Sequence, residues 1–147
     1  MNTKVTVTAA MVTVLLAAGA CSPALGASAA REANIEVTID EFMNTQHVAR
    51  QVEVSEGGVL TVDLGSNPTT GFGWTETAQI GNPTVLQQSE SNFLPPENEG
   101  LVGASGTQVW TFSALKKGTS TISMDYGRPW AGGEKGVWTF ELTVTVK

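Results

Sequence analysis

The last segment of the chain carries the most constraining pattern in the sequence, a strict alternation between apolar and polar side chains. The apolar residues at every second position are Trp138, Phe140, Leu142, Val144 and Val146. Threonine or glutamate stands at each position between them. A two-residue period places one set of side chains on each face of a β-strand, whereas a helix repeats every 3.6 residues. The segment therefore predicts a strand with one face in a hydrophobic core and the other in water.

The same alternation recurs at residues 35–39 and 110–114. Further strand candidates, bounded by Gly, Pro, Asn or Ser, are residues 48–54, 59–64, 74–80, 85–88 and 120–126. No segment shows helical periodicity over three turns. Seven or eight short strands with frequent turn signals predict an all-β fold, an immunoglobulin-like sandwich of two sheets.

The composition agrees with this fold class and excludes several others. The 147 residues suit one domain, and 16 glycines, 6 prolines and only 15% charged residues are typical of a turn-rich β protein rather than a helical bundle. The formal charge of -6 offers no extended positive surface for a phosphate backbone. Nucleic acid is therefore not an expected partner.

The first thirty residues have the character of an export signal. Lys4 is the only charged residue before Arg31, and residues 5–20 form a run of small or apolar side chains. As a helix, this run would rise about 24 Å, which is short of the roughly 30 Å hydrocarbon core of a membrane. We therefore interpret residues 1–20 as a signal peptide rather than a permanent membrane span.

Two cleavage sites are compatible with the sequence. Residues 18–20 before Cys21 resemble a bacterial lipobox, with Ala18 where that pattern usually has Leu, and cleavage there would leave a lipid on Cys21. Cleavage near residues 27–29, a small-x-small site, would instead release a soluble domain. We expect an exported protein in either case, a cell-envelope lipoprotein or a periplasmic or secreted one.

This interpretation divides the chain into the signal peptide, a tether at residues 21–33 and one folded domain at residues 34–147. Cys21 is the only cysteine, so the domain has no internal disulfide. His47 is the only histidine and lies in a strand-like segment, and no Ser-His-Asp, metal-ligand or phosphate-binding pattern is present. We expect no enzymatic activity, no metal and no cofactor.

Three connections between predicted strands are longer than a chain reversal requires and contain residues that a turn does not need. The first, residues 66–74, contains the run Asn-Pro-Thr-Thr-Gly-Phe. Pro68 fixes its own φ, Gly71 permits a positive φ, and the two threonine hydroxyls can hydrogen-bond locally. We expect a rigid finger, with Trp74 more simply explained as a core residue.

The other two connections are less specific. Residues 89–106 are acidic and aperiodic, contain Pro95-Pro96 and end in Gly-x-x-Gly at 103–106, which indicates either a working loop or a loose one. Residues 127–136 place Trp130 at a glycine-rich tip. That indole could be an exposed anchor or could fold back onto its own sandwich, and the sequence leaves both possibilities open.

Taken together, Asn-Pro-Thr-Thr-Gly-Phe at 67–72, Gly-x-x-Gly at 103–106 and Arg-Pro-Trp at 128–130 resemble the three loop motifs of the chagasin family, protein inhibitors of papain-like cysteine proteases. The resemblance extends over residues 34–147. It implies an immunoglobulin-like sandwich, acting as a monomer, whose three loops lie side by side at one end. These loops would occlude the catalytic cleft of a papain-like protease reversibly, without a covalent step.

The resemblance also implies the contact residues. A wedge at residues 68–71 would lie next to the catalytic cysteine of the protease, flanked by the other two loops. The complete implied set is Asn67, Pro68, Thr69, Thr70, Gly71, Phe72, Gly103, Ala104, Ser105, Gly106, Arg128, Pro129 and Trp130. Departures from the family pattern, at Gly73, at residues 104–105 and in the acidic stretch before them, bear on which protease is preferred.

Two other functions remain compatible with the residues alone. An exported β domain with Trp130 exposed, alone or together with Trp74, could stack on sugar rings as a carbohydrate-binding or adhesion module. A structural envelope lipoprotein is the other possibility. Contact with a membrane is expected only through a lipid on Cys21.

Overall fold

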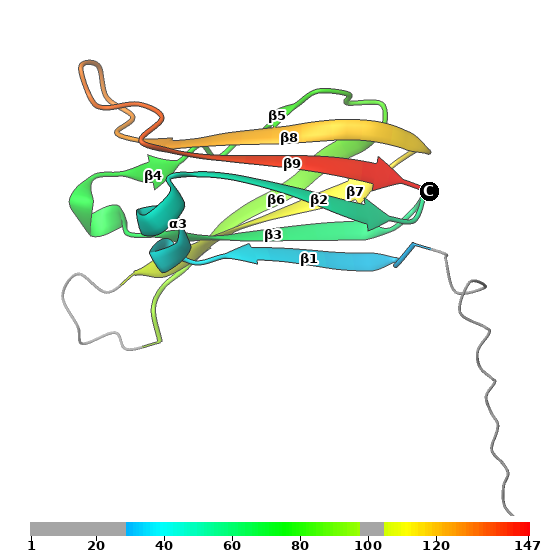
Figure 1. Cartoon of the computed structure of the whole chain (residues 1–147), viewed down its shortest axis with the longest axis horizontal. Helices are drawn as coiled ribbons and strands as arrows, with labels where there is room; N and C mark the ends of the chain where they lie inside the picture. The colour runs from blue at the N-terminus through cyan, green and yellow to red at the C-terminus, as the bar shows by residue number, and fades with distance from the viewer. Residues whose placement is uncertain (1–28, 98–104) are drawn as a thin grey trace, which may run out of the picture.

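The computed structural model describes residues 29–97 and 105–147, which form two layers of strands with one α-helix at an end (Figure 1). The strands are β1 (Glu32–Val37), β2 (His47–Val54), β3 (Val59–Ser66), β4 (Gly73–Trp74), β5 (Gln79–Ile80), β6 (Leu86–Leu94), β7 (Gly106–Ala114), β8 (Gly118–Gly127) and β9 (Trp138–Val146). The helix is α3 (Ile39–Thr45), and a single 3-10 turn, η2, covers Pro68–Thr70.

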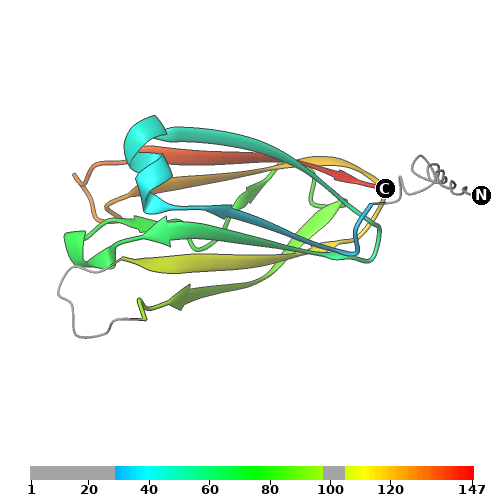
Figure 2. The ribbon, with the colours of Figure 1, turned by 60° about the horizontal axis from the view of Figure 1, so that its bottom comes forward.

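The strands form two sheets packed face to face (Figure 2). One sheet has the order β1-β3-β7-β6, and the other has the order β2-β9-β8-β4 with β5 also paired to β8. The β1–β3 and β2–β9 pairs are parallel and the rest are antiparallel. The predicted immunoglobulin-like sandwich is confirmed. Since β1 and β2 belong to different sheets, α3 between them bridges the two layers.

The alternating segments supply the core, as predicted. In β9, the side chains of Phe140, Leu142 and Val144 are buried, while the threonine and glutamate side chains between them are not. In β7, Trp110 and Phe112 are fully buried. Because no disulfide joins the sheets, this interdigitated apolar layer holds them together.

The helix α3 stands where the alternation predicted a continuing first strand, so the placement of Ile39 in that strand is wrong. Thr38 caps the helix, with its hydroxyl oxygen accepting a hydrogen bond of 3.3 Å from the Glu41 amide. Phe42 is fully buried, and its ring stacks on Trp138 at a centroid distance of 5.4 Å. The helix has seven residues, about two turns, which is too short for helical periodicity to show in the sequence.

Two further predicted boundaries are wrong. Residues 74–80, expected as one strand, form the short strands β4 and β5 separated by a turn. Residues 89–106, expected to be aperiodic, continue β6 as far as Leu94, and Gly106 is already the first residue of β7. The sequence shows no clear alternation in β6, because it is an edge strand whose side chains are mostly exposed and because a register shift follows Gln88.

The connections that carry the motifs leave the sandwich at one end. Ser66 at the end of β3 pairs with Gly106 at the start of β7, and Gly73 in β4 pairs with Gly127 at the end of β8. Figures 1 and 2 show α3 at this same end. We call it the loop end. The C-terminus and residues 29–31 lie at the opposite end (Figure 1).

The folded domain begins slightly before the predicted boundary at residue 34. The strand β1 begins at Glu32, and the carbonyl oxygens of Ala30 and Arg31 accept hydrogen bonds of 2.8 Å from amides that flank the turn before β3. The last residues assigned to the tether therefore belong to the sandwich. The predicted signal peptide lies outside the described residues. Within the described part, no helix is long and apolar enough to cross a membrane.

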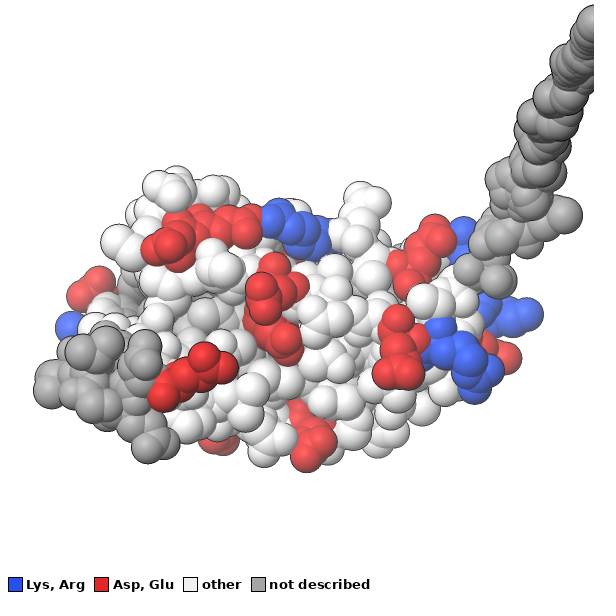
Figure 3. Space-filling view, turned by 90° about the horizontal axis from the view of Figure 1, so that it is seen from below, with Lys and Arg blue, Asp and Glu red and all other residues white. Residues whose placement is uncertain are grey.

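Charged side chains are unevenly distributed over the surface. Figure 3 shows Asp and Glu side chains spread along one face of the sandwich, whereas most of the Lys and Arg visible there gather toward the end that holds the termini. At the C-terminus, Lys147 pairs with Glu53 at 3.0 Å. On this face, the acidic side chains are thus dispersed along the sandwich rather than gathered at one end.

Candidate functional site

The loop between β3 and β4 is braced by its own polar groups. The side-chain oxygen of Asn67 accepts hydrogen bonds from the amide of Thr69, at 3.3 Å, and from its hydroxyl, at 2.5 Å. The Thr70 hydroxyl donates to the Asn67 carbonyl at 2.8 Å, and the Gly71 amide donates to the Pro68 carbonyl at 3.0 Å. Gly71 has φ of +82°, a conformation that favours glycine. The prediction of a tip stiffened by threonine hydrogen bonds is confirmed.

The base of this loop is fixed to β8 and to the core. The amide of Asn67 donates a hydrogen bond of 3.1 Å to the hydroxyl of Tyr126, whose ring stacks with Phe72 at 5.7 Å. Trp74 is only 7% exposed, and its indole N–H donates to the Gly65 carbonyl at 2.9 Å. Trp74 is therefore a core residue, and the hypothesis that it is exposed and stacks on sugar rings is wrong.

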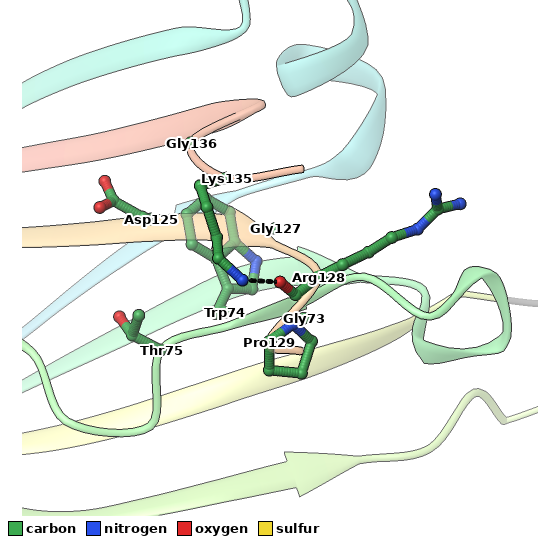
Figure 4. Close-up of a pocket in the computed structure, with 9 residues that line it drawn as sticks. All are labelled: Gly73, Trp74, Thr75, Asp125, Gly127, Arg128, Pro129, Lys135 and Gly136. Carbon is green, nitrogen blue, oxygen red and sulfur yellow. Dashed lines mark hydrogen bonds between the residues drawn. The ribbon is translucent and has the colours of Figure 1, made fainter. Parts of the chain in front are cut away.

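The loop between β8 and β9 is a second braced structure. The Arg128 amide donates to the Glu134 carbonyl at 2.7 Å, and the Gly133 amide donates to the Trp130 carbonyl at 3.0 Å. The Lys135 ammonium folds under the loop and donates to the carbonyl of Arg128 (Figure 4) and to that of Trp130. The side chain of Trp130 remains 52% exposed, so the indole does not fold back into the core of its own sandwich.

The two braced loops touch each other through Arg128. Its guanidinium carbon lies 4.4 Å from the ring centroid of Phe72 and 5.8 Å from that of Trp130, within the range of cation–π contact. The Nε atom of Arg128 is buried and has no hydrogen-bond partner among the described residues, so stacking, together with an ion pair to Glu134 at 3.5 Å, positions this side chain. The Trp130 ring also packs on Gly71, where an added Cβ would lie 2.8 Å from Cη2.

The middle motif is described only in part. Gly103 and Ala104 lie outside the described residues, as does Cys21. Ser105 is exposed next to the loop end, whereas Gly106 is buried within β7. A Cβ on Gly106 would lie 2.4 Å from the Leu94 carbonyl oxygen, so the packing of this chain explains that glycine without a partner.

Sequence reasoning missed three exposed apolar side chains near these loops. Phe93 is 39% exposed and Leu94 is 53% exposed at the end of β6, which reaches the loop end because Leu94 pairs with Thr107. Met43 on α3 is 67% exposed. A Phe-Leu pair directly before two prolines was the available signal for the first two. No sequence signal indicated Met43, because the two-turn helix is too short to show helical periodicity.

Two grooves flank the braced loops. One, with a volume of about 470 Å³, lies between β4 and the loop that follows β8, with Thr75, Asp125 and Pro129 among its lining residues (Figure 4). The other, of about 270 Å³, lies between α3 and the loop that follows β3. Both open beside exposed motif residues, so a partner that covers the loop end can reach them.

The described part of the chain holds no chemistry that points to catalysis. His47 is exposed and shares a hydrogen bond of 2.8 Å with the Thr139 hydroxyl on the neighbouring strand. No group of three or more His, Cys, Asp or Glu side chains among the described residues could hold a metal ion. What the loop end offers is a stiff, protruding surface of proline, threonine and tryptophan, which is suited to binding.

Comparisons with known proteins agree with this geometry. The model of the chagasin family of peptidase inhibitors, I42, matches residues 53–144, which include all three motifs. The chain is 33% identical to chagasin from Trypanosoma cruzi over 89 residues, which cover 58% of this chain and 79% of chagasin. It is 26% identical to amoebiasin-2 from Entamoeba histolytica over 101 residues, covering 65% of this chain and 76% of that protein.

A solved structure shows the same fold. The crystal structure of a cysteine protease inhibitor from Entamoeba histolytica superposes with a TM-score of 0.57 at 23% identity, covering 79% of this chain and 97% of that one. The family model spans more than half of the chain, and members of the family are protease inhibitors rather than enzymes. The chain therefore belongs to the chagasin family of peptidase inhibitors.

Proposed function

We propose that this protein is a reversible, tight-binding inhibitor of papain-like cysteine proteases and that its loop end occludes their catalytic cleft. The observation that carries the proposal is the single rigid surface that Arg128 makes by joining the loops at 67–72 and 128–136. The wedge at residues 68–71 would enter the cleft next to the catalytic cysteine. Trp130 would cover one flank, and residues 103–106 would lie on the other.

The wedge should resist cleavage because local hydrogen bonds hold its backbone in a turn. The Asn67 carbonyl accepts from the Thr70 hydroxyl at 2.8 Å and the Pro68 carbonyl accepts from the Gly71 amide at 3.0 Å. Presenting either carbonyl to a nucleophile in an extended backbone would break this turn. A loop that is already ordered also loses little conformational entropy on docking, which favours tight binding.

The exposed Trp130 is suited to an interface of this kind. Protease–inhibitor interfaces bury about 800 Å² on each partner and are among the tightest known. Energetic anchors in such interfaces are commonly Trp or Arg side chains that become buried in pockets of the partner. Trp130, half exposed and held from below by Arg128, is the corresponding anchor here, and we expect nanomolar or tighter inhibition.

We also propose that the protein acts outside the cytoplasm, as a cell-envelope lipoprotein or a periplasmic or secreted inhibitor. The apolar run at residues 5–20 supports export. Residues 29–31 lie at the end of the sandwich opposite the loops, so a lipid on Cys21 would be attached on the side of the domain away from the loop end (Figure 1). Mass spectrometry of the mature N-terminus distinguishes a lipidated Cys21 from cleavage near residues 27–29.

The experiment that tests the inhibitor function is a titration of papain and of cathepsin L with the purified protein, using a fluorogenic peptide substrate. We expect stoichiometric inhibition at nanomolar concentrations, with activity returning on dilution and the inhibitor recovered uncut. Full protease activity in the presence of micromolar folded protein would contradict the proposal.

A further inference from the structure

An apolar groove runs beside the wedge, between α3 and the loop that follows β3. Its volume of about 270 Å³ is far more than the roughly 10–15 Å³ that a cavity needs to hold one water molecule, so a side chain can enter it. Ile39 and Met43 line it from the helix, Thr70 and Phe72 from the loop, and Trp138 from the start of β9. The groove thus shares three of its lining residues, Asn67, Thr70 and Phe72, with the loop of the first motif.

Met43 is the most exposed large apolar side chain in the described part of the chain, at 67%. It projects from a fixed base, because its neighbour Phe42 is fully buried, 5.4 Å from the ring of Trp138 and 5.0 Å from that of Trp74. Methionine adapts its shape to an apolar partner at little cost. A flexible apolar side chain on a rigid support is well suited to contact a partner.

The helix that carries Met43 lies outside residues 53–144, the part of the chain matched by the family model. It nevertheless lies at the loop end, because it bridges the two sheets there (Figure 2). Any contact that α3 makes with a protease therefore comes in addition to the three motif loops.

We propose that this groove receives an apolar side chain from the rim of the protease cleft, so that α3 forms a fourth contact region with the bound papain-like protease. The inference rests on the proposed function. The protease is the occupant because the groove is continuous with the wedge loop, since Thr70 and Phe72 belong to both surfaces. An interface of about 800 Å² also extends well beyond the few residues of a loop tip.

The test is the Met43→Glu variant, measured by the inhibition constant for papain. Glutamate has a helix propensity close to that of methionine, so the exposed position should keep α3 folded. We expect inhibition to weaken at least tenfold, mainly through faster dissociation. Met43→Leu, which stays apolar, should remain within about threefold of wild type, and Met43→Lys should lose as much as Met43→Glu.

The matched control is Leu115→Glu, which makes the same kind of change at a side chain that is 46% exposed and follows β7 at the opposite end of the sandwich. We expect its inhibition constant to equal that of the wild type. If the wild type inhibits papain and the inhibition constant of Met43→Glu lies within twofold of the wild-type value, the groove proposal is overturned and the proposed function stays intact. Tighter binding by Met43→Lys would also overturn it, because the contact would then be electrostatic.

Two further outcomes would contradict the proposals. If the wild type does not inhibit papain at all, both the proposed function and the groove proposal are wrong. A dimer in solution that Met43→Glu dissociates would make a second copy of this chain the occupant, which also overturns the proposal. Sedimentation of the wild type alone and with papain, expected to give a monomer and a one-to-one complex, checks this point.

Discussion

The guanidinium carbon of Arg128 lies 4.4 Å from the ring centroid of Phe72. Through this contact, the loop that precedes β4 and the loop that follows β8 form one surface rather than two separate fingers. The same guanidinium lies 5.8 Å from the ring centroid of the exposed Trp130. The shape offered to a protease therefore depends on how well this stack is maintained.

Arg128→Lys tests the stack. Lysine keeps the positive charge next to Glu134 but lacks the planar guanidinium that packs on aromatic faces. We expect inhibition of papain to weaken roughly tenfold, or about 1.4 kcal/mol, while the melting temperature changes by only about 2 °C. Inhibition equal to wild type would show that the stack does not shape the binding surface.

Trp130→Ala tests the anchor. The indole is 52% exposed in the free protein, and burying it against a partner should account for about 2 kcal/mol, a roughly thirtyfold change in Kd. Stability should be almost unchanged, because the side chain contributes little to the core. The Kd from calorimetry and the melting temperature check both parts, and a change in Kd below twofold would place Trp130 at the rim.

Gly71→Ala tests the contact between the two loops, with Gly132→Ala as its control. Both glycines have φ of +82°, so both variants should lose about 1 kcal/mol of stability from backbone strain. A Cβ at position 71 would also collide with Trp130 at 2.8 Å, whereas at position 132 nothing lies within 4 Å. We therefore expect a loss of inhibition of tenfold or more for Gly71→Ala only. Equal losses in the two variants would contradict the contact.

Thr70→Glu tests the wedge, with Thr70→Ser as its control. Serine retains the hydroxyl that donates to the Asn67 carbonyl, and we expect it to inhibit within a few-fold of wild type. Glutamate loses this bond, at a cost of about 1 kcal/mol of stability, and places a charge in the cleft, so inhibition should disappear while the protein stays folded. Melting curves and inhibition constants check the pair. Undiminished inhibition by Thr70→Glu would remove residues 68–71 from the interface.

The sandwich could be predicted because its central strands alternate strictly. β7 and β9 have neighbours on both sides and one face in the core, so burial leaves a two-residue period in the sequence. The edge strand β6 leaves almost none, since only Leu86 among its nine residues is buried. The helix α3 is stabilised by Phe42 packing on Trp138, a contact between segments far apart in the chain.

The sequence predicted the motifs of the candidate site but not the contacts that join its loops. The local bonds of Asn67 with Thr69 and Thr70 follow from residues two and three positions apart, and the sequence indicates them. The stack of Arg128 on Phe72 joins residues 56 positions apart, which only the pairing of β4 with β8 brings together. The exposure of Trp130 depends on the same arrangement.

The most direct test of the account is whether the loop end covers the catalytic cysteine of the protease. The rate at which iodoacetamide alkylates that cysteine in papain can be measured with and without saturating inhibitor. We expect alkylation to slow in proportion to the fraction of papain bound and to return to its full rate when the complex is diluted. Alkylation at the full rate in a saturated complex would contradict the central claim.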